Sequence, residues 1–420
     1  MRSRNRSRSF ALAMLTPFYA LLSHPWGGVA IGVVVAAIGV LLLLVSRRPI
    51  TGQRTGRARL ARALGVLVAA FSVFVLAAAA VSMIEIRRLA SQHPAPGTLV
   101  DVGGYRMHIL AEGDAGDGPT VIWIPGGHAQ GLALHHLHSA IRGETRSILF
   151  DRPGTGWSDP GPYPRRTATE AVEFATLLEQ AGEEGPFVLA GHSYGGLLAA
   201  NYARRHPERT AAVVLLDASP PDAFIYAPAY GAAALDGLVR DAERQGLDKI
   251  FGGWTNPEIA MADNETEVGE ILRKQRRLLA DVGEAMAANA RRPAASFASA
   301  SIFQEFSPGI VSSAAPDLVV YDGELGDMPV LVVIPDDPAD AIIDPLGMEE
   351  AAASRAKNFF VRMRVRYLEI SSDARLVHTP PGTGHNYPYE TPEFVLDVVR
   401  QLLAELSGDH AEVAGDEDSR

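Results

Sequence analysis

The sequence predicts an α/β fold with a mostly parallel β-sheet, preceded by membrane-spanning helices. Short apolar runs typical of buried parallel strands recur between residues 120 and 378. Segments with helical periodicity separate them, and this alternation implies parallel strands whose helices cover both faces of the sheet. Residues 1–88 contain two long stretches without a charged side chain.

The first 88 residues also differ from the remainder in charge. They contain twelve arginines and a single acidic residue, Glu85, whereas the whole chain has a formal net charge of −11. The globular remainder is therefore strongly acidic. Because it would repel phosphate groups, we expect no nucleic-acid partner. The sequence has no cysteine, which excludes disulfides, thiolate metal ligands and a cysteine nucleophile.

Uncharged stretches run from Trp26 to Val45 and from Ala63 to Ile84. Each can cross a hydrocarbon core of about 30 Å at ~1.5 Å per residue. We therefore expect a membrane anchor over residues 1–88, with transmembrane helices at about 26–45 and 63–84. Six arginines lie in the connection between the two stretches. The positive-inside rule would keep them in the cytoplasm and place the globular part on the extracytoplasmic side.

The apolar run Phe10–Leu22 leaves the number of membrane passes open. At 13 residues with Pro17 inside, it is short for a crossing. Three passes would place both the N-terminal arginines and those of the connection on the cytoplasmic side and still leave the globular part outside. With two passes, the N-terminal arginines and Arg87-Arg88 oppose the arginines of the connection, which leaves the orientation open. A cleavable signal peptide is a further alternative.

Beyond the anchor we expect a linker over residues 89–97, the globular domain over 98–406 and a disordered acidic tail over 407–420. The strand pattern stops between about residues 222 and 317, where helical periodicity predicts an inserted cap. The expected strands are a hairpin at 99–109 and single strands at 120–124, 146–150, 187–190, 212–217, 330–334 and 375–378.

The motif Gly-x-Ser-x-Gly at residues 191–195 directly follows the apolar run 187–190 and precedes a helix of small residues. Gly191 and Gly195 lack a Cβ, so the backbone can turn sharply and hold Ser193 in a strained conformation. The hydroxyl would then stand at a helix N-terminus, where N–H groups favour a developing oxyanion. The pattern predicts a catalytic serine; a glycine-rich turn is the alternative.

Ser193 needs a neighbouring base, because a serine hydroxyl is a poor nucleophile. His385 follows the last expected strand on a glycine-containing loop, and histidine titrates near neutrality. We therefore expect it to be the base, with a surface loop histidine as the alternative. Ligands bind at the carboxyl ends of strands in such sheets, where Ser193, His385, Asp217 and the Gly126-Gly127 pair all fall.

The acid that would orient His385 has three candidates. Asp217 ends a clear strand, whereas Asp337 and Asp340 lie in the loop after strand 330–334. The strand end fixes the position of Asp217, whereas nothing in the sequence fixes the positions of Asp337 and Asp340 within their loop. The sequence therefore favours Asp217. A structural aspartate at the strand end is the alternative.

Four motifs together resemble the α/β-hydrolase superfamily over residues 97–406. The resemblance implies an esterase-like serine hydrolase, with the backbone N–H groups of Gly127 and Tyr194 forming an oxyanion hole. It also places the usual acid after strand 330–334, where this sequence lacks the common Gly-x-x-Asp pattern, although some relatives place it one strand earlier. The motifs are Gly191-His192-Ser193-Tyr194-Gly195-Gly196, Asp151-Arg152-Pro153-Gly154-Thr155-Gly156-Trp157-Ser158, Pro125-Gly126-Gly127 and Gly384-His385.

We therefore expect a membrane-anchored serine hydrolase that cleaves carboxylic esters through an acyl-Ser193 intermediate and needs no cofactor. The membrane tether and the cap favour a small-molecule, lipid-like ester. A non-catalytic binding protein of the same fold is one alternative, and a perhydrolase or cofactor-free C–C hydrolase is another. His135, His136 and His138 predict no metal site, because the adjacent pair cannot share one helix face and no acidic partner is evident.

Overall fold

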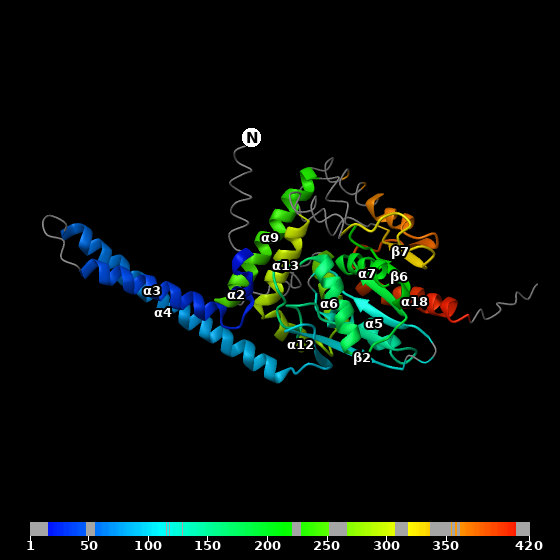
Figure 1. Ribbon diagram of the computed structural model, residues 1–420, viewed down its shortest axis with the longest axis horizontal. Coiled ribbons are helices and arrows are strands. Elements are labelled where there is room, and N and C mark those ends of the chain that lie inside the picture. The colour runs from blue at the N-terminus through cyan, green and yellow to red at the C-terminus, as the bar shows by residue number, and fades with distance from the viewer. Residues whose placement is uncertain are drawn as a thin grey trace, which may run out of the picture.

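The computed structural model describes residues 16–47, 55–220 except 115, 117 and 128, then 228–251, 267–306, 318–336, 354, 358 and 362–408. A long helical hairpin projects from a body built around one twisted sheet (Figure 1). The sheet has eight strands in the order β1-β2-β4-β3-β5-β6-β7-β8. The strands are β1 (Thr98–Asp101), β2 (Arg106–Glu112), β3 (Thr120–Ile124), β4 (Ser147–Phe150), β5 (Phe187–His192), β6 (Thr210–Leu216), β7 (Val330–Ile334) and β8 (Ala374–His378).

The mostly parallel sheet that the sequence predicts is confirmed. Strand β2 pairs antiparallel with β1 and β4, and every other neighbouring pair is parallel. All five residues of β3, and likewise of β7, are buried, which is why both read as continuous apolar runs. The parallel strands end at one edge of the sheet, so residues that follow β3, β5, β6, β7 and β8 are brought together there.

Helices cover both faces of the sheet and create two hydrophobic cores. On one face, α6 (Thr167–Gln180) and α7 (Tyr194–Arg205) contribute Phe174 and Tyr202 to the first core. On the other, α5 (His135–Ile141) and α18 (Pro392–Leu406) contribute Ile141 and Val399 to the second. Shorter elements complete the described body: η2 (Gly131–Leu134), η3 (Pro207–Arg209), η5 (Arg366–Glu369) and α17 (Tyr387–Glu390).

Four helices lie in the described part of the chain between β6 and β7, where the sequence predicts a cap. They are α9 (Pro228–Ile250), α11 (Glu267–Leu278), α12 (Gly283–Ala290) and α13 (Pro293–Glu305). The long helices α9 and α13 lie side by side above the sheet (Figure 1).

The projecting hairpin consists of α3 (Gly27–Arg47) and α4 (Thr55–Gln92), both long and apolar enough to cross a membrane. The two helices pack closely, since a Cβ on Gly32 would lie 2.6 Å from the Leu76 side chain. Their outer faces expose large apolar side chains, among them Leu41, Leu67 and Phe74. The connection to β1 is shorter than the expected linker 89–97, because α4 continues to Gln92.

A short N-terminal arm, η1 (Thr16–Phe18) and α2 (Tyr19–Ser23), packs against the cap instead of continuing the hairpin. Tyr19 is fully buried against Phe297 of α13. Its hydroxyl donates to Glu243 of α9 at 2.5 Å and accepts from Gln304 of α13 at 2.9 Å. This placement argues against a membrane crossing by Phe10–Leu22. Residues 1–15 and the expected tail beyond Gly408 lie outside the described residues.

The arm should contribute measurably to the stability of the cap. We expect Tyr19→Ala to cost about 3 kcal/mol or more, because it removes a buried aromatic ring and leaves two buried polar groups without their partner. Thermal unfolding of the detergent-solubilised protein checks this as a lower Tm. Phe18→Ala is the matched control, since Phe18 is 52% exposed and its loss should leave the Tm nearly unchanged. Equal shifts for both variants would contradict the packing described here.

Candidate active site

Ser193 lies in the sharp turn between β5 and α7, in the conformation that the sequence predicts. Its backbone has φ 53° and ψ −122°, a region that side chains rarely adopt. A Cβ on Gly191 would collide with the carbonyl of Gly195, and one on Gly195 with the carbonyl of Ile124. The two glycines are thus required by close backbone approach, and the turn presents Ser193 at the first turn of α7.

Asp217 follows β6 in a second strained position, with φ 47°. In the described chain, Ser193 and Asp217 are the two non-glycine residues with positive φ. Such conformations cost about 1–3 kcal/mol each and cluster at functional sites. Hydrogen bonds fix both turns: the N–H of Ser193 donates to Leu216 at 3.0 Å, and the N–H of Asp217 donates to Val333 at 2.8 Å.

The structure brings Asp217 and His385 into direct contact. The Nδ1 atom of His385 is hydrogen-bonded to one carboxylate oxygen of Asp217. The Asp217 side chain is fully buried, whereas the imidazole of His385 is 14% exposed at the edge of the site. An acid on Nδ1 holds the ring orientation and the tautomer that leave Nε2 free to accept a proton.

The other carboxylate oxygen of Asp217 faces Arg364, whose Nε lies 2.6 Å away. Both side chains are buried, so water screens the attraction between the two groups only weakly. Arg364 therefore positions the acid without reaching the reacting atoms. Its role could not be predicted from the sequence, because no local pattern links Arg364 to a strand end.

The sequence offers two other candidates for the acid. Asp337 and Asp340 lie outside the described residues. Their neighbour Asp336, directly after β7, accepts a hydrogen bond from the N–H of Gly382 at 3.0 Å. Asp336 thereby ties the loop of His385 to the end of β7 through the backbone.

Ser193 and His385 are not hydrogen-bonded to each other among the described residues. The Ser193 hydroxyl has its contact with the hydroxyl of Ser219, at 3.5 Å. Catalytic hydrogen bonds of this kind commonly tighten only when substrate binds. The backbone of Ser219 is fixed from two sides, because its N–H donates to Ser193 at 3.0 Å and its carbonyl accepts from Tyr367 at 2.9 Å.

The predicted oxyanion donors lie beside Ser193. A Cβ on Gly126 would come within 2.9 Å of the Ser193 Cβ, so the turn after β3 abuts the serine. The buried Arg152 donates to the carbonyls of Gly126 and Gly127. Because a trans peptide points its C=O and N–H in opposite directions, holding the Gly126 carbonyl turns the Gly127 N–H away from Arg152. Tyr194, the first residue of α7, has an N–H without an intrahelical acceptor.

His192, inside the serine motif, supports the loop of His385. Its Nε2–H donates to the carbonyl of His385 at 2.9 Å, and the two rings lie 4.7 Å apart. Burial and the neighbouring His385 lower the pKa of His192 to about 3. His192 is thus neutral near pH 7 and acts as a fixed donor, so it cannot serve as a second titrating base.

The histidine cluster on α5 has protein partners. His135 contacts Asp281 at 3.2 Å, and His136 is hydrogen-bonded to the carbonyl of Pro388 at 2.8 Å. His138 bridges Ser147 at 2.9 Å and Glu112 at 2.8 Å. The partners lie in four different segments, namely the turn before α12, α17, β4 and β2, and join α5 to its surroundings. Two of them, Asp281 and Glu112, are acidic partners that were not evident from the sequence.

Comparison with known proteins decides the family. The family model described as "Alpha/beta hydrolase family" matches residues 121–398, which is more than half of the chain. The chain belongs to the alpha/beta hydrolase family. The matched region begins in β3 and ends in α18, so it includes the turn of Ser193, the end of β6 and the loop of His385.

Individual relatives are more distant. The chain is 26% identical over 162 residues to the uncharacterized protein YbdG of Bacillus subtilis, covering 38% of this chain and 48% of that protein. It is 30% identical over 131 residues to a cis-3-alkyl-4-alkyloxetan-2-one decarboxylase of Xanthomonas campestris, covering 28% and 43% respectively. The matches thus span less than half the length of these curated relatives.

Among solved structures, the chain resembles a probable hydrolytic enzyme from Pseudomonas aeruginosa. The TM-score is 0.53 at 19% identity, with 74% of this chain and 94% of the other covered. At this identity the likeness shows the fold, and the chemistry has to be argued from the site.

The three candidate acids can be separated by amide substitution. We expect Asp217→Asn to lower the turnover of a p-nitrophenyl ester by about 10⁴-fold, because an amide on Nδ1 stabilises the wrong tautomer of His385. Asp337→Asn and Asp340→Asn should keep near wild-type rates. Asp336→Asn is the control for the loss of a carboxylate from the loop after β7. A large loss in Asp337→Asn or Asp340→Asn with an active Asp217→Asn would contradict the assignment.

Proposed function

We propose that this protein hydrolyses carboxylic esters through an acyl-Ser193 intermediate. The observation that supports it most is the convergence of two strained residues, Ser193 and Asp217, with His385 at the carboxyl edge of the sheet. Strain of this kind persists only where the surrounding structure over-determines it, and here it falls on the nucleophile and the acid of one arrangement.

The proposed reaction follows from these positions. His385 Nε2 accepts the proton of Ser193 Oγ as the oxygen attacks the ester carbonyl, and the N–H groups of Gly127 and Tyr194 stabilise the oxyanion. Collapse of the tetrahedral intermediate expels the alkoxide, which takes the proton from His385. The same imidazole then deprotonates a water molecule, which attacks the acyl-enzyme and releases the carboxylic acid product. Asp217 stabilises the imidazolium in both halves of the cycle.

Family membership supports hydrolytic chemistry. The decarboxylase among the relatives acts, by its name, on an oxetan-2-one, which contains an ester within a ring. The cap and the apolar hairpin favour a substrate of apolar, lipid-like character. We place the ester class above the non-catalytic alternative because Ser193, His385 and Asp217 are all present in one site.

Covalent labelling tests the nucleophile. A fluorophosphonate probe should label the wild-type protein and leave Ser193→Ala unlabelled, because the phosphonate reacts with an activated serine. Ser219→Ala is the matched control and should still be labelled, since Ser219 contacts Ser193 without a base of its own. In-gel fluorescence gives the measurement. The proposal is refuted if folded wild-type protein is not labelled, or if Ser193→Ala is labelled.

We also infer that α3 and α4 cross a membrane as a two-pass hairpin, with the catalytic body on the extracytoplasmic side. Two features support it. The outward faces of both helices are apolar. The arginine-rich connection joins the C-terminal end of α3 to the N-terminal end of α4, and these two helix ends lie opposite the body (Figure 1). The N-terminal arm packs on the cap, so it lies on the same side as the body.

Single cysteines test this orientation, because the chain has none of its own. A membrane-impermeant maleimide applied to intact cells should label Ser91→Cys at the body end of α4. It should leave Thr51→Cys, in the connection between the helices, unlabelled until the cells are lysed. The reverse pattern would overturn the orientation, and labelling of both positions would overturn the crossing itself.

A further inference from the structure

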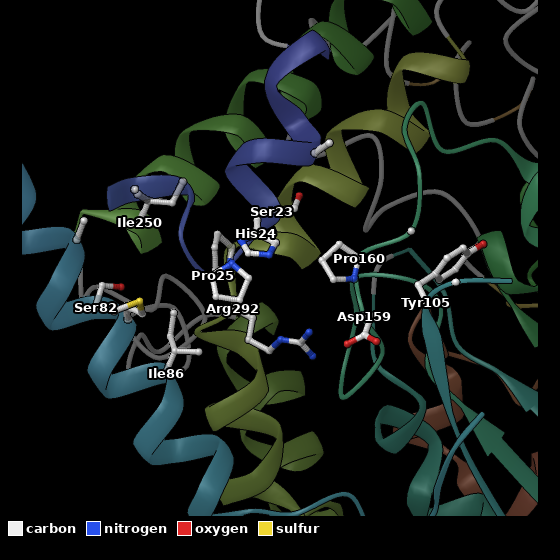
Figure 2. A pocket seen from close by; sticks show the side chains of 17 residues that line it. Ser23, His24, Pro25, Ser82, Ile86, Tyr105, Asp159, Pro160, Ile250 and Arg292 are labelled. Carbon is white, nitrogen blue, oxygen red and sulfur yellow. The ribbon is translucent and has the colours of Figure 1, made fainter. Parts of the chain in front are cut away.

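A cavity of about 480 Å³ lies where the anchor hairpin meets the body, away from Ser193 (Figure 2). It is lined by five parts of the chain: α2 with its connection to the start of α3, the body end of α4, the turn between β1 and β2, the loop 159–161 and the cap helices. None of its lining residues belongs to the proposed catalytic machinery. The cavity is therefore separate from the site described above.

The wall formed by α4 and α9 is mostly apolar. Ala79, Met83 and Ile86 of α4 line it together with Ile250 of α9. These α4 residues lie at the body end of the expected span 63–84, where a membrane-spanning helix leaves the hydrocarbon core. This wall would therefore lie at the level where lipid acyl chains give way to headgroups.

The opposite wall presents cationic and hydrogen-bonding groups. The Arg292 guanidinium extends from the cap into the space between Pro25 and Asp159 (Figure 2). It donates to the carbonyls of Gly156 and Ser158, the latter at 2.8 Å. A guanidinium has five N–H donors, so these two bonds hold the group in place and leave donors for a ligand.

His24 adds a second donor at the mouth of the cavity. Its Nδ1 accepts the N–H of Trp26 at 3.2 Å, so the neutral ring carries its proton on Nε2. Asp159 is the acidic residue of the lining, and its carboxylate is paired with Arg106 at 3.0 Å. The buried Asp151 also attracts Arg292, but its carboxylate is hydrogen-bonded to His108, and among the described residues neither carboxylate lies within ion-pair distance of the Arg292 guanidinium. The donors of Arg292 that remain can therefore bind an anion at the polar end of the cavity.

Two residues next in sequence to the cavity lining are typical of a membrane interface: Trp26 follows the lining residue Pro25, and Arg87 follows Ile86. Trp26 is 48% exposed, and the guanidinium of Arg87 lies 5.0 Å from the centre of its ring. Tryptophan and arginine are enriched at the headgroup level of membrane proteins. An amphiphile with an anionic group at one end and an apolar chain at the other matches both walls.

We propose that this junction cavity binds one phospholipid of the leaflet next to the body, with its phosphate on Arg292 and His24 and the start of its acyl chain against α4. The inference goes beyond ester hydrolysis and rests on the membrane crossing proposed above. A lipid held there touches the hairpin, the N-terminal arm and the cap at once. Its binding free energy would therefore stabilise the arrangement of all three.

Retention of lipid tests the proposal. The full chain is reconstituted in nanodiscs of phosphatidylcholine with phosphatidylglycerol, extracted in a mild detergent and examined by native mass spectrometry. We expect one retained phospholipid per wild-type chain. Arg292→Gln should lower its affinity by about tenfold or more, because a charged hydrogen bond to the phosphate is lost. Ala79→Phe should do the same by filling the apolar end.

Arg244→Gln is the matched control. Arg244 is an exposed arginine of the same cap, is paired with Asp241 on α9 and does not line the cavity. It should retain lipid as the wild type does. Fluorophosphonate labelling of Arg292→Gln and Ala79→Phe reports whether the body is folded, and we expect it to be unchanged. Retention by both variants equal to wild type, or no retained lipid on the wild type, would overturn the proposal.

Inorganic phosphate separates a lipid from a free phosphate ester. Millimolar phosphate should not raise the Tm of delipidated protein, whereas phosphatidylglycerol should raise it in the wild type and not in Ala79→Phe. A rise with phosphate alone, equal in Ala79→Phe, would assign the cavity to a soluble anion instead. Release of the chain from membranes by alkaline carbonate would overturn the lipid site together with the crossing.

Discussion

The contact between Asp217 and His385 is the interaction on which the candidate site depends. It joins residues from the ends of β6 and β8, and it forms only because β7 lies between these strands in parallel register. Arg364 closes the arrangement from the far side of the carboxylate. The acid is therefore placed by sheet order and a buried cation, and its strained backbone is held by hydrogen bonds to neighbouring strands.

A second constraint links the helical hairpin of α3 and α4 to the cap. Tyr19 occupies the cap interior with its hydroxyl between Glu243 and Gln304, and Ser82 of α4 donates to the carbonyl of Lys249 at 2.6 Å. Cap, arm and hairpin are thereby one packed unit above the sheet.

Much of the fold could be read from local patterns. Buried parallel strands such as β3 appear as apolar runs in the sequence. Gly191 and Gly195 indicate the turn around Ser193, because a Cβ at either position would collide with the backbone. The position of His385 follows from the last strand. By contrast, Arg364, Ser219 and the support from Arg152 are side-chain contacts between segments far apart in sequence. No local periodicity encodes them.

The sequence by itself determined the class of fold, the two long apolar helices and the turn that presents Ser193, since each depends on residues within one short segment. Only the tertiary structure decided that Asp217 meets His385 and that residues 16–23 pack on the cap. It alone brought Arg292 to a cavity at the end of α4. These outcomes depend on strand order, burial and the meeting of distant helices, which are properties of the folded chain as a whole.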